Sequence, residues 1–194
     1  PRPQLPTGGT VADDEKDTEI KNFTDAVATV QNILLNKAEQ SKGHAKEVLT
    51  ATAQLTADRG LARSVKKLIQ HGDSAEWAVV QATDNLVTQF ERLGGLYAER
   101  TTDLKDIRDR LIAELRGEPA PGVPEPTEPI VLLAEDLAPA DPAGLHPELP
   151  VALVTEGGGK TSHTAIIARQ LGIPCIVSAG KALRQIKNGT PVLV

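Results

Sequence analysis

The run EGGGKTSHTAIIARQLGIP, from Glu156 to Pro174, is the most informative part of the chain. Three glycines, a lysine and two hydroxyl residues lead to His163, which the pattern places in the first turn of a helix. A helix N-terminus offers unpaired N–H groups and a positive dipole end, and both suit a phosphoryl group. A positive potential also disfavours protonated imidazole, and only a neutral ring nitrogen can attack phosphorus. The run therefore predicts a phosphate-bearing histidine.

Short apolar segments surround this run and predict a small sheet. The helix of the run spans Thr164 to Leu171 and is closed by Gly172 and Pro174. A strand, a glycine loop, a helix and a strand form a βαβ unit with the loop at the carboxyl edge of the sheet. The predicted strands are Ile130–Leu133, Val151–Val154, Cys175–Val177 and Val192–Val194.

Other interpretations of His163 are weaker or stay open. A glycine-flanked histidine is often only a loop residue or a helix cap. Metal binding is disfavoured because no second His or Cys lies at ligand spacing. A nucleophilic Ser162 is disfavoured because Gly-X-Ser-X-Gly is absent, and a Walker loop because GxxxxGK is absent.

The first half of the chain has a different pattern. From about Val11 to Leu115, apolar residues recur at steps of three and four, which predicts helices packed in a bundle. The Gly94-Gly95 pair is predicted to bend or interrupt a helix. Asp73 is predicted to cap the start of that same helix, with Glu76 in capping-box register. Five prolines and two glycines between Gly117 and Pro129 predict a stiff, extended connector.

The predicted fold is therefore α+β or α/β: a four-helix-bundle-like subdomain joined to a swivelling β/α subdomain. We expect the helical subdomain at residues 1–117, with a lead-in at 1–10. The connector is expected at 118–129 and the swivelling subdomain at 130–194. Because the sequence begins with Pro and stops within the last predicted strand, we expect a fragment trimmed at both ends.

Composition limits the classes of function. The net charge is −5 and the pI is near 5.4, which argues against non-specific binding of nucleic acid. No apolar run is long enough to cross a membrane. The single cysteine, Cys175, allows no intrachain disulfide, so a reducing cytoplasm is the expected compartment. Cys175 itself is expected to be an inert core residue.

Three stretches together resemble a known family. GGGKTSHTAIIARQLGIPCIV is similar to the phosphohistidine signature of Enzyme I of the phosphoenolpyruvate:sugar phosphotransferase system, pyruvate phosphate dikinase and phosphoenolpyruvate synthase. AERTTDLKDIRDRLIAEL (Ala98 to Leu115) and LLAEDLAPADPAGL (Leu132 to Leu145) resemble segments of Enzyme I in particular. The resemblance covers nearly the whole chain and is strongest to actinobacterial members.

This resemblance implies a phosphoenolpyruvate-protein phosphotransferase, represented by its N-terminal part. The histidine that matches His163 takes phosphate from phosphoenolpyruvate through Nε2 and passes it to a histidine of the phosphocarrier protein HPr. The partners implied are HPr and the enzyme's own C-terminal barrel, which binds phosphoenolpyruvate and Mg²⁺ and forms the dimer. This chain lacks the barrel, so no cofactor is expected in it and phosphoenolpyruvate alone is not expected to charge it.

The candidate site residues follow the signature. Gly157, Gly158 and Gly159 are expected to shape the loop. Thr161 or Ser162 is expected to bond phosphate or to cap the helix. Lys160 is either a phosphate counter-charge or a solvated lysine, and Arg169 either forms a structural ion pair or reaches phosphate. The predicted phosphate loop also includes Thr164.

The resemblance also places HPr on the helical subdomain, where an acidic and partly apolar surface would suit its basic rim. The matching positions are Leu49, Ala53, Leu55, Gly60, Leu61, Ala62 and Arg100. Leu55 is one of these positions, and its alternative role is that of a buried core residue rather than a contact with HPr.

Relatives have a threonine that orients the resting histidine, and here that position is Pro142, so the orienting contact comes from elsewhere or is absent. His44, His71 and His146 are expected to have no chemical role. The alternative functions are the swivelling domain of a dikinase or synthase, and a regulatory binding module in which His163 is never phosphorylated.

Overall fold

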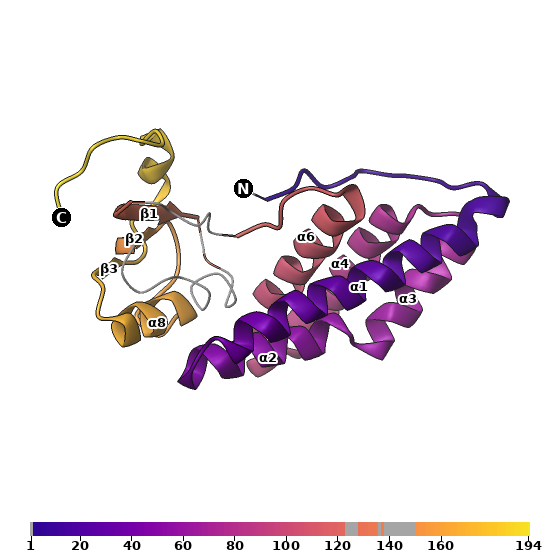
Figure 1. Ribbon diagram of the computed structural model, residues 1–194, viewed down its shortest axis with the longest axis horizontal. Helices are drawn as coiled ribbons and strands as arrows, with labels where there is room; N and C mark the ends of the chain where they lie inside the picture. Colours follow the sequence, from indigo (N-terminus) through magenta and orange to yellow (C-terminus); the bar gives the residue numbers. More distant parts are fainter. Residues whose placement is uncertain (1, 123–127, 136, 138–149) are drawn as a thin grey trace.

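The computed structural model describes residues 2–122, 128–135, 137 and 150–194. Long helices lie side by side in the first part, and a small sheet with one helix below it forms the second part (Figure 1). The predicted fold class is confirmed. A short 3₁₀ turn, η1 (Asp13–Glu15), precedes the bundle. The helices are α1 (Lys16–Glu39), α2 (Gly43–Thr56), α3 (Arg59–Gln70), α4 (Ala75–Leu93), α5 (Leu96–Glu99) and α6 (Thr101–Arg116).

Aliphatic side chains fill the core of the bundle, as the 2% aromatic content predicts. Phe23 is the one aromatic residue in the buried cluster, and small residues such as Ala53 and Ala78 let the helices approach closely. Burial of this apolar surface is the main source of stability. The largest fully buried side chains of the cluster are Phe23, Leu34, Leu49, Val65, Ile69, Val79, Ile107, Leu111 and Ile112.

The helix ends follow from local chemistry, with one correction. Asp58 caps α3 by accepting a hydrogen bond from the Leu61 N–H at 2.8 Å. The cap of α4 is Ser74, not Asp73 as predicted, because the Ser74 hydroxyl accepts the N–H of Trp77. Asp73 instead accepts a hydrogen bond from the amide of Gln81.

The Gly94-Gly95 pair separates α4 from α5. Both residues have positive φ, 67° and 55°, which side-chain-bearing residues rarely adopt. The prediction that the pair bends or interrupts the helix is confirmed as an interruption. Leu96 and Tyr97 beyond it are exposed, and Tyr97 packs edge-on against Phe90.

Three parallel strands form the sheet in the order β1-β2-β3. The strands are β1 (Ile130–Ala134), β2 (Pro150–Thr155) and β3 (Cys175–Ile176). Helix α8 (His163–Leu171) connects β2 to β3, so the predicted βαβ unit is confirmed. A 3₁₀ helix, η2 (Lys181–Gln185), follows the sheet. The core of this part is small and centres on Leu137, Leu153 and Ala168.

The prediction of a strand at Val192–Val194 is wrong. These residues have no regular secondary structure, and 55%, 101% and 68% of their respective surfaces are exposed. An isolated extended segment has no partner for its backbone groups, so apolar sequence alone does not make a strand.

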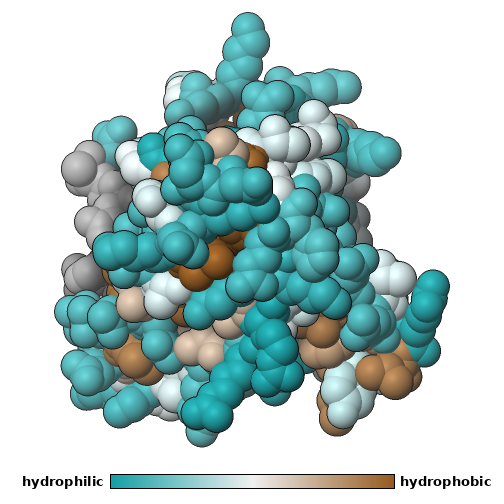
Figure 2. Space-filling view, turned by 90° about the vertical axis from the view of Figure 1, so that its right-hand side faces the viewer, coloured by the Kyte–Doolittle hydropathy of each residue, from teal (hydrophilic) through white to brown (hydrophobic). Residues whose placement is uncertain are grey.

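Helix α6 ends at Arg116 and β1 begins at Ile130, on either side of the expected connector. The domain boundaries themselves stay a prediction. Among the described residues, no helix is long and apolar enough to cross a membrane. The end of the bundle farthest from the sheet is mostly hydrophilic (Figure 2).

Candidate phosphohistidine site

His163 is the first residue of α8, and its side chain is exposed. Ser162 caps the helix: its backbone is extended, with φ −63° and ψ 153°, and its Oγ accepts the N–H of Ala165 at 3.3 Å. The other N–H groups of the first turn stay available for an anion beside His163. The positive end of the helix dipole therefore lies beside the imidazole, as the sequence predicts.

The glycine loop before α8 is fixed by bonds to its carbonyl groups. The Thr155 hydroxyl donates to the Gly157 carbonyl at 2.8 Å, and the Ser178 hydroxyl donates to the Gly158 carbonyl at 2.6 Å. The Ser178 N–H also bonds the Gly157 carbonyl at 3.0 Å. With its carbonyl groups held by other residues, the loop is ordered before any ligand arrives.

Sequence reasoning missed Thr155 and Ser178. A signal was available, because Thr155 ends β2 and Ser178 follows β3. The carboxyl ends of neighbouring parallel strands meet at one edge of a sheet, so polar residues after each strand are expected beside the loop.

The predicted loop residues differ in what they can offer. Lys160 and Thr161 are exposed and free to turn toward an anion. The Thr164 side chain is 1% exposed, and its hydroxyl has no hydrogen-bond partner among the described residues. Thr164 would therefore reach a phosphate beside His163 through its backbone rather than through its side chain.

Arg169 points back toward the loop. Its Nη2 donates to the Lys160 carbonyl at 3.4 Å, and it forms no ion pair with the part of the chain that the structure describes. Among the described residues, no carboxylate therefore neutralises the charge of Arg169 close to the loop. The structure does not bear out the ion-pair alternative, and phosphate binding by Arg169 stays a prediction.

An acidic pair limits the positive potential on the other side of the loop. Arg184 of η2 binds Glu156 at 2.7 Å and Glu135 at 3.3 Å. The bond to Glu156 raises the pKa of Arg184. Because Arg184 is paired with these carboxylates, Lys160 and Arg169 are better candidates, among the described residues, to meet a phosphoryl group.

The imidazole of His163 faces a second histidine from the bundle. The rings of His44 and His163 are stacked, with centroids 6.0 Å apart and an angle of 11° between their planes. His44 is the second residue of α2, so two helix N-termini meet here. No pattern in the sequence indicates this contact, because His44 and His163 belong to helices that are far apart along the chain.

Comparison with known proteins identifies the family of the chain. The family described as "PEP-utilising enzyme, N-terminal" matches residues 3–100, and "PEP-utilising enzyme, mobile domain" matches residues 126–194. The chain belongs to the PEP-utilising enzymes. The loop and His163 lie within the matched mobile domain of this family.

Among the PEP-utilising enzymes, two relatives with high similarity have the same name. A phosphoenolpyruvate-protein phosphotransferase of Streptomyces coelicolor is 43% identical over 169 residues, covering 87% of this chain and 30% of that protein. A protein of the same name from Haloferax volcanii is 38% identical, with 89% and 31% covered. The chain therefore spans about a third of the length of these curated relatives.

A solved structure gives the same result for the fold. The solution structure of Enzyme I (nEIt) aligns with a TM-score of 0.76 and 29% identity, over 96% of this chain and 78% of that one. The resemblance to Enzyme I is thus confirmed for both parts of the chain.

Within this PEP-utilising enzyme, the positions expected to bind HPr do not form one surface. Leu49, Ala53 and Leu61 are at most 4% exposed and belong to the core. This part of the prediction is corrected: these residues support α2 and α3 from within and cannot touch a partner. Leu55 and Ala62 are partly buried against the same core.

Gly60 and Arg100 are exposed, and the surface beside Gly60 is basic rather than acidic. A groove along α3 contains the side chains of Arg59, Arg63, Lys66 and Lys67. The apolar residues of α3 face inward, which leaves the cations outside. The expected acidic surface is therefore not provided by this helix.

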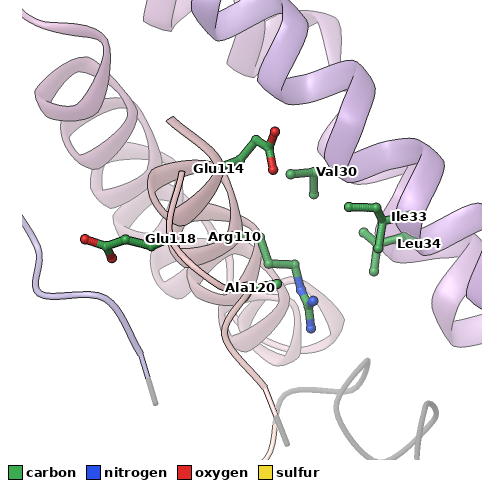
Figure 3. A pocket seen from close by; sticks show the side chains of 7 residues that line it. All are labelled: Val30, Ile33, Leu34, Arg110, Glu114, Glu118 and Ala120. Atoms are coloured by element: carbon green, nitrogen blue, oxygen red, sulfur yellow. The ribbon is translucent and has the colours of Figure 1, made fainter. Parts of the chain in front are cut away.

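A second pocket lies between α1 and α6, on the bundle (Figure 3). It contains none of the predicted site residues. It is lined by Val30, Ile33, Leu34, Arg110, Glu114, Glu118 and Ala120. No group of three or more His, Cys, Asp or Glu side chains that could hold a metal ion occurs among the described residues.

Proposed function

We propose that this chain is the phosphoryl-carrying part of a phosphoenolpyruvate-protein phosphotransferase, with His163 as the carrier. The observation that supports this best is the position of His163. It is exposed at the start of a capped helix, behind a loop whose carbonyl groups are already bonded. The names of the relatives support the same reaction.

In the proposed reaction, the lone pair of His163 Nε2 attacks the phosphorus of phosphoenolpyruvate. The P–N bond forms as the bond from phosphorus to the enol oxygen breaks, and the enolate leaves and takes a proton from solvent to become pyruvate. A histidine of HPr then attacks the same phosphorus, and the electron pair of the P–N bond returns to His163. Both steps conserve charge and need no oxidant.

The residues around His163 serve these steps in different ways. The open N–H groups of α8 meet the phosphoryl oxygens, and Lys160 and Arg169 supply positive charge. Phosphoenolpyruvate and Mg²⁺ are bound by the C-terminal part of the enzyme, and HPr docks on the exposed surface of the bundle.

Transfer from HPr tests this function. The chain is incubated with HPr carrying radioactive phosphate, and the label is located by mass spectrometry after proteolysis. We expect an acid-labile, hydroxylamine-sensitive phosphate on His163, and none in His163→Gln. His71→Ala is a suitable control, because His71 lies exposed at the end of α3.

The same experiment separates the alternatives. Absence of label on His163 in the unaltered chain would show a regulatory binding module rather than a carrier. A chain that accepts phosphate from a dikinase or synthase C-terminal part, but not from HPr, would belong to those enzymes instead.

A further inference from the structure

The contact between His44 and His163 suggests a role for a residue outside the phosphate loop. The rings are nearly parallel, with an angle of 11° and centroids 6.0 Å apart. They come from the starts of α2 and α8, and Figure 1 shows the end of the α1–α2 hairpin beside α8. Stacked rings with centroids about 4.5–7 Å apart are among the favourable geometries for ring pairs.

Packing rather than hydrogen bonding places the His44 ring. Its Nδ1 lies 3.9 Å from Glu47 Oε2, which is too far for a hydrogen bond. Its Nε2 is buried and has no hydrogen-bond partner among the described residues. The His44 side chain is 33% exposed, so most of its surface is covered by neighbouring residues.

Stacking suits a nucleophilic histidine because it leaves the reacting electrons free. The lone pair of an imidazole nitrogen lies in the plane of the ring. A second ring packed on the face therefore restricts rotation of the side chain without covering the nitrogen that attacks. Restricting the rotamer before reaction lowers the entropic cost of reaching the reactive geometry.

We propose that His44 is a positioning residue for His163. Its ring holds the unphosphorylated imidazole of His163 in one orientation through the stacked contact. The catalytic part of this inference rests on the proposed function, whereas the contact itself does not. For this role His44 needs to supply only a flat ring. Neither proton transfer nor metal binding by His44 is required.

Substitution of His44 tests the proposal with two readouts. The chain is labelled with ¹⁵N-histidine, and the ring resonances of His163 are recorded by NMR. In His44→Ala we expect these resonances to shift and to approach the values of a freely rotating side chain. We also expect phosphate transfer from HPr to slow by about two- to tenfold, which corresponds to the interaction free energy of a stacked ring pair.

Two further variants complete the design. His44→Phe keeps a flat ring without nitrogen atoms, so we expect it to restore the transfer rate and a ring-current effect on His163. His71→Ala removes an exposed histidine from the end of α3 and should change neither readout.

The outcomes are distinguishable. Unchanged His163 resonances in His44→Ala overturn the proposal, as does a slower rate that His44→Phe does not restore. If the unaltered chain accepts no phosphate, the proposed function fails, while the resonances still report whether His44 orients His163.

Discussion

Asp103, in the first turn of α6, is an ionisable residue in an unusual environment. Its Oδ1 is buried without a hydrogen-bond partner among the described residues. Burial raises the pKa of its carboxyl from 3.8 to about 6, although the charge of Arg100 acts in the opposite direction. The carboxyl therefore binds its proton more tightly in the folded chain than in the unfolded one.

This shift predicts how stability depends on pH. As pH rises from about 4 to about 6, the unfolded chain loses this proton before the folded chain does, so the free energy of unfolding decreases. Two pKa units correspond to about 3 kcal/mol. Asp103→Asn lacks this carboxyl. Over this pH range we therefore expect its urea midpoint to rise relative to the midpoint of the unaltered chain. A difference that does not change with pH would contradict the assignment.

Gly158 is the residue of the loop whose backbone requires glycine. Its φ is 86°, and an added Cβ would lie 3.5 Å from Ser162 Oγ. Because this conformation costs a side-chain-bearing residue about 1–2 kcal/mol, we expect Gly158→Ala to distort the loop and slow phosphate transfer to His163. Gly159→Ala is the matched control, since its Cβ would meet nothing within 4 Å and its φ is ordinary. Equal rates for the two variants would argue against a fixed loop.

Helix α8 is the element on which the site depends, and one hydroxyl fixes its start. Ser162 Oγ accepts the N–H of Ala165, so Ser162→Ala should lower the free energy of unfolding by about 1 kcal/mol. Because fraying would begin at His163, transfer should slow as well. Ser74→Ala removes the equivalent cap of α4 and should cost similar stability without affecting transfer. Denaturant unfolding measures the stability of the two variants, and the rate of phosphate transfer measures their function. Loss of transfer in both variants would indicate a general folding defect.

Elements with a local cause were predictable from the sequence. The helices follow from their apolar spacing, and the end of α8 follows from Gly172, whose φ of 70° needs glycine. The cap of α4 was assigned one residue too early, because Asp73 and Ser74 are equally suitable cap residues by sequence. The strand at Val192–Val194 was wrong because pairing depends on distant neighbours. The site was predicted as far as the loop and His163 but not His44, since no periodicity connects residues of different subdomains.

At the scale of the whole chain, length bears on the proposed reaction. The 194 residues span about a third of the length of their curated relatives. We therefore expect phosphoenolpyruvate and Mg²⁺ to leave His163 unphosphorylated in this chain alone. Adding the separately produced C-terminal part of the Streptomyces relative should restore phosphorylation, which mass spectrometry would detect. Phosphorylation without that addition would show a second phosphoenolpyruvate site within these residues.

The surface of the molecule bears on partner choice. The exposed cations of α3 lie beside Gly60, one of the positions expected to meet HPr. Contacts between such a surface and a basic partner would be repulsive, so docking is expected to avoid this side of α3. Arg100, beyond α5, lies on a different part of the bundle and remains a candidate contact.

The parallel pairing of β1 with β2 has a consequence for how the chain folds. Neighbouring helices such as α1 and α2 pack together soon after both exist, because few residues separate them. Ile130 pairs with Pro150 only after two strands that are separated in the sequence come together, and parallel strands cannot be joined by a tight turn. Contacts between distant residues form more slowly. During synthesis the bundle can therefore be complete before the loop around His163 has been made, so the nucleophile is assembled last, against a surface that is already folded.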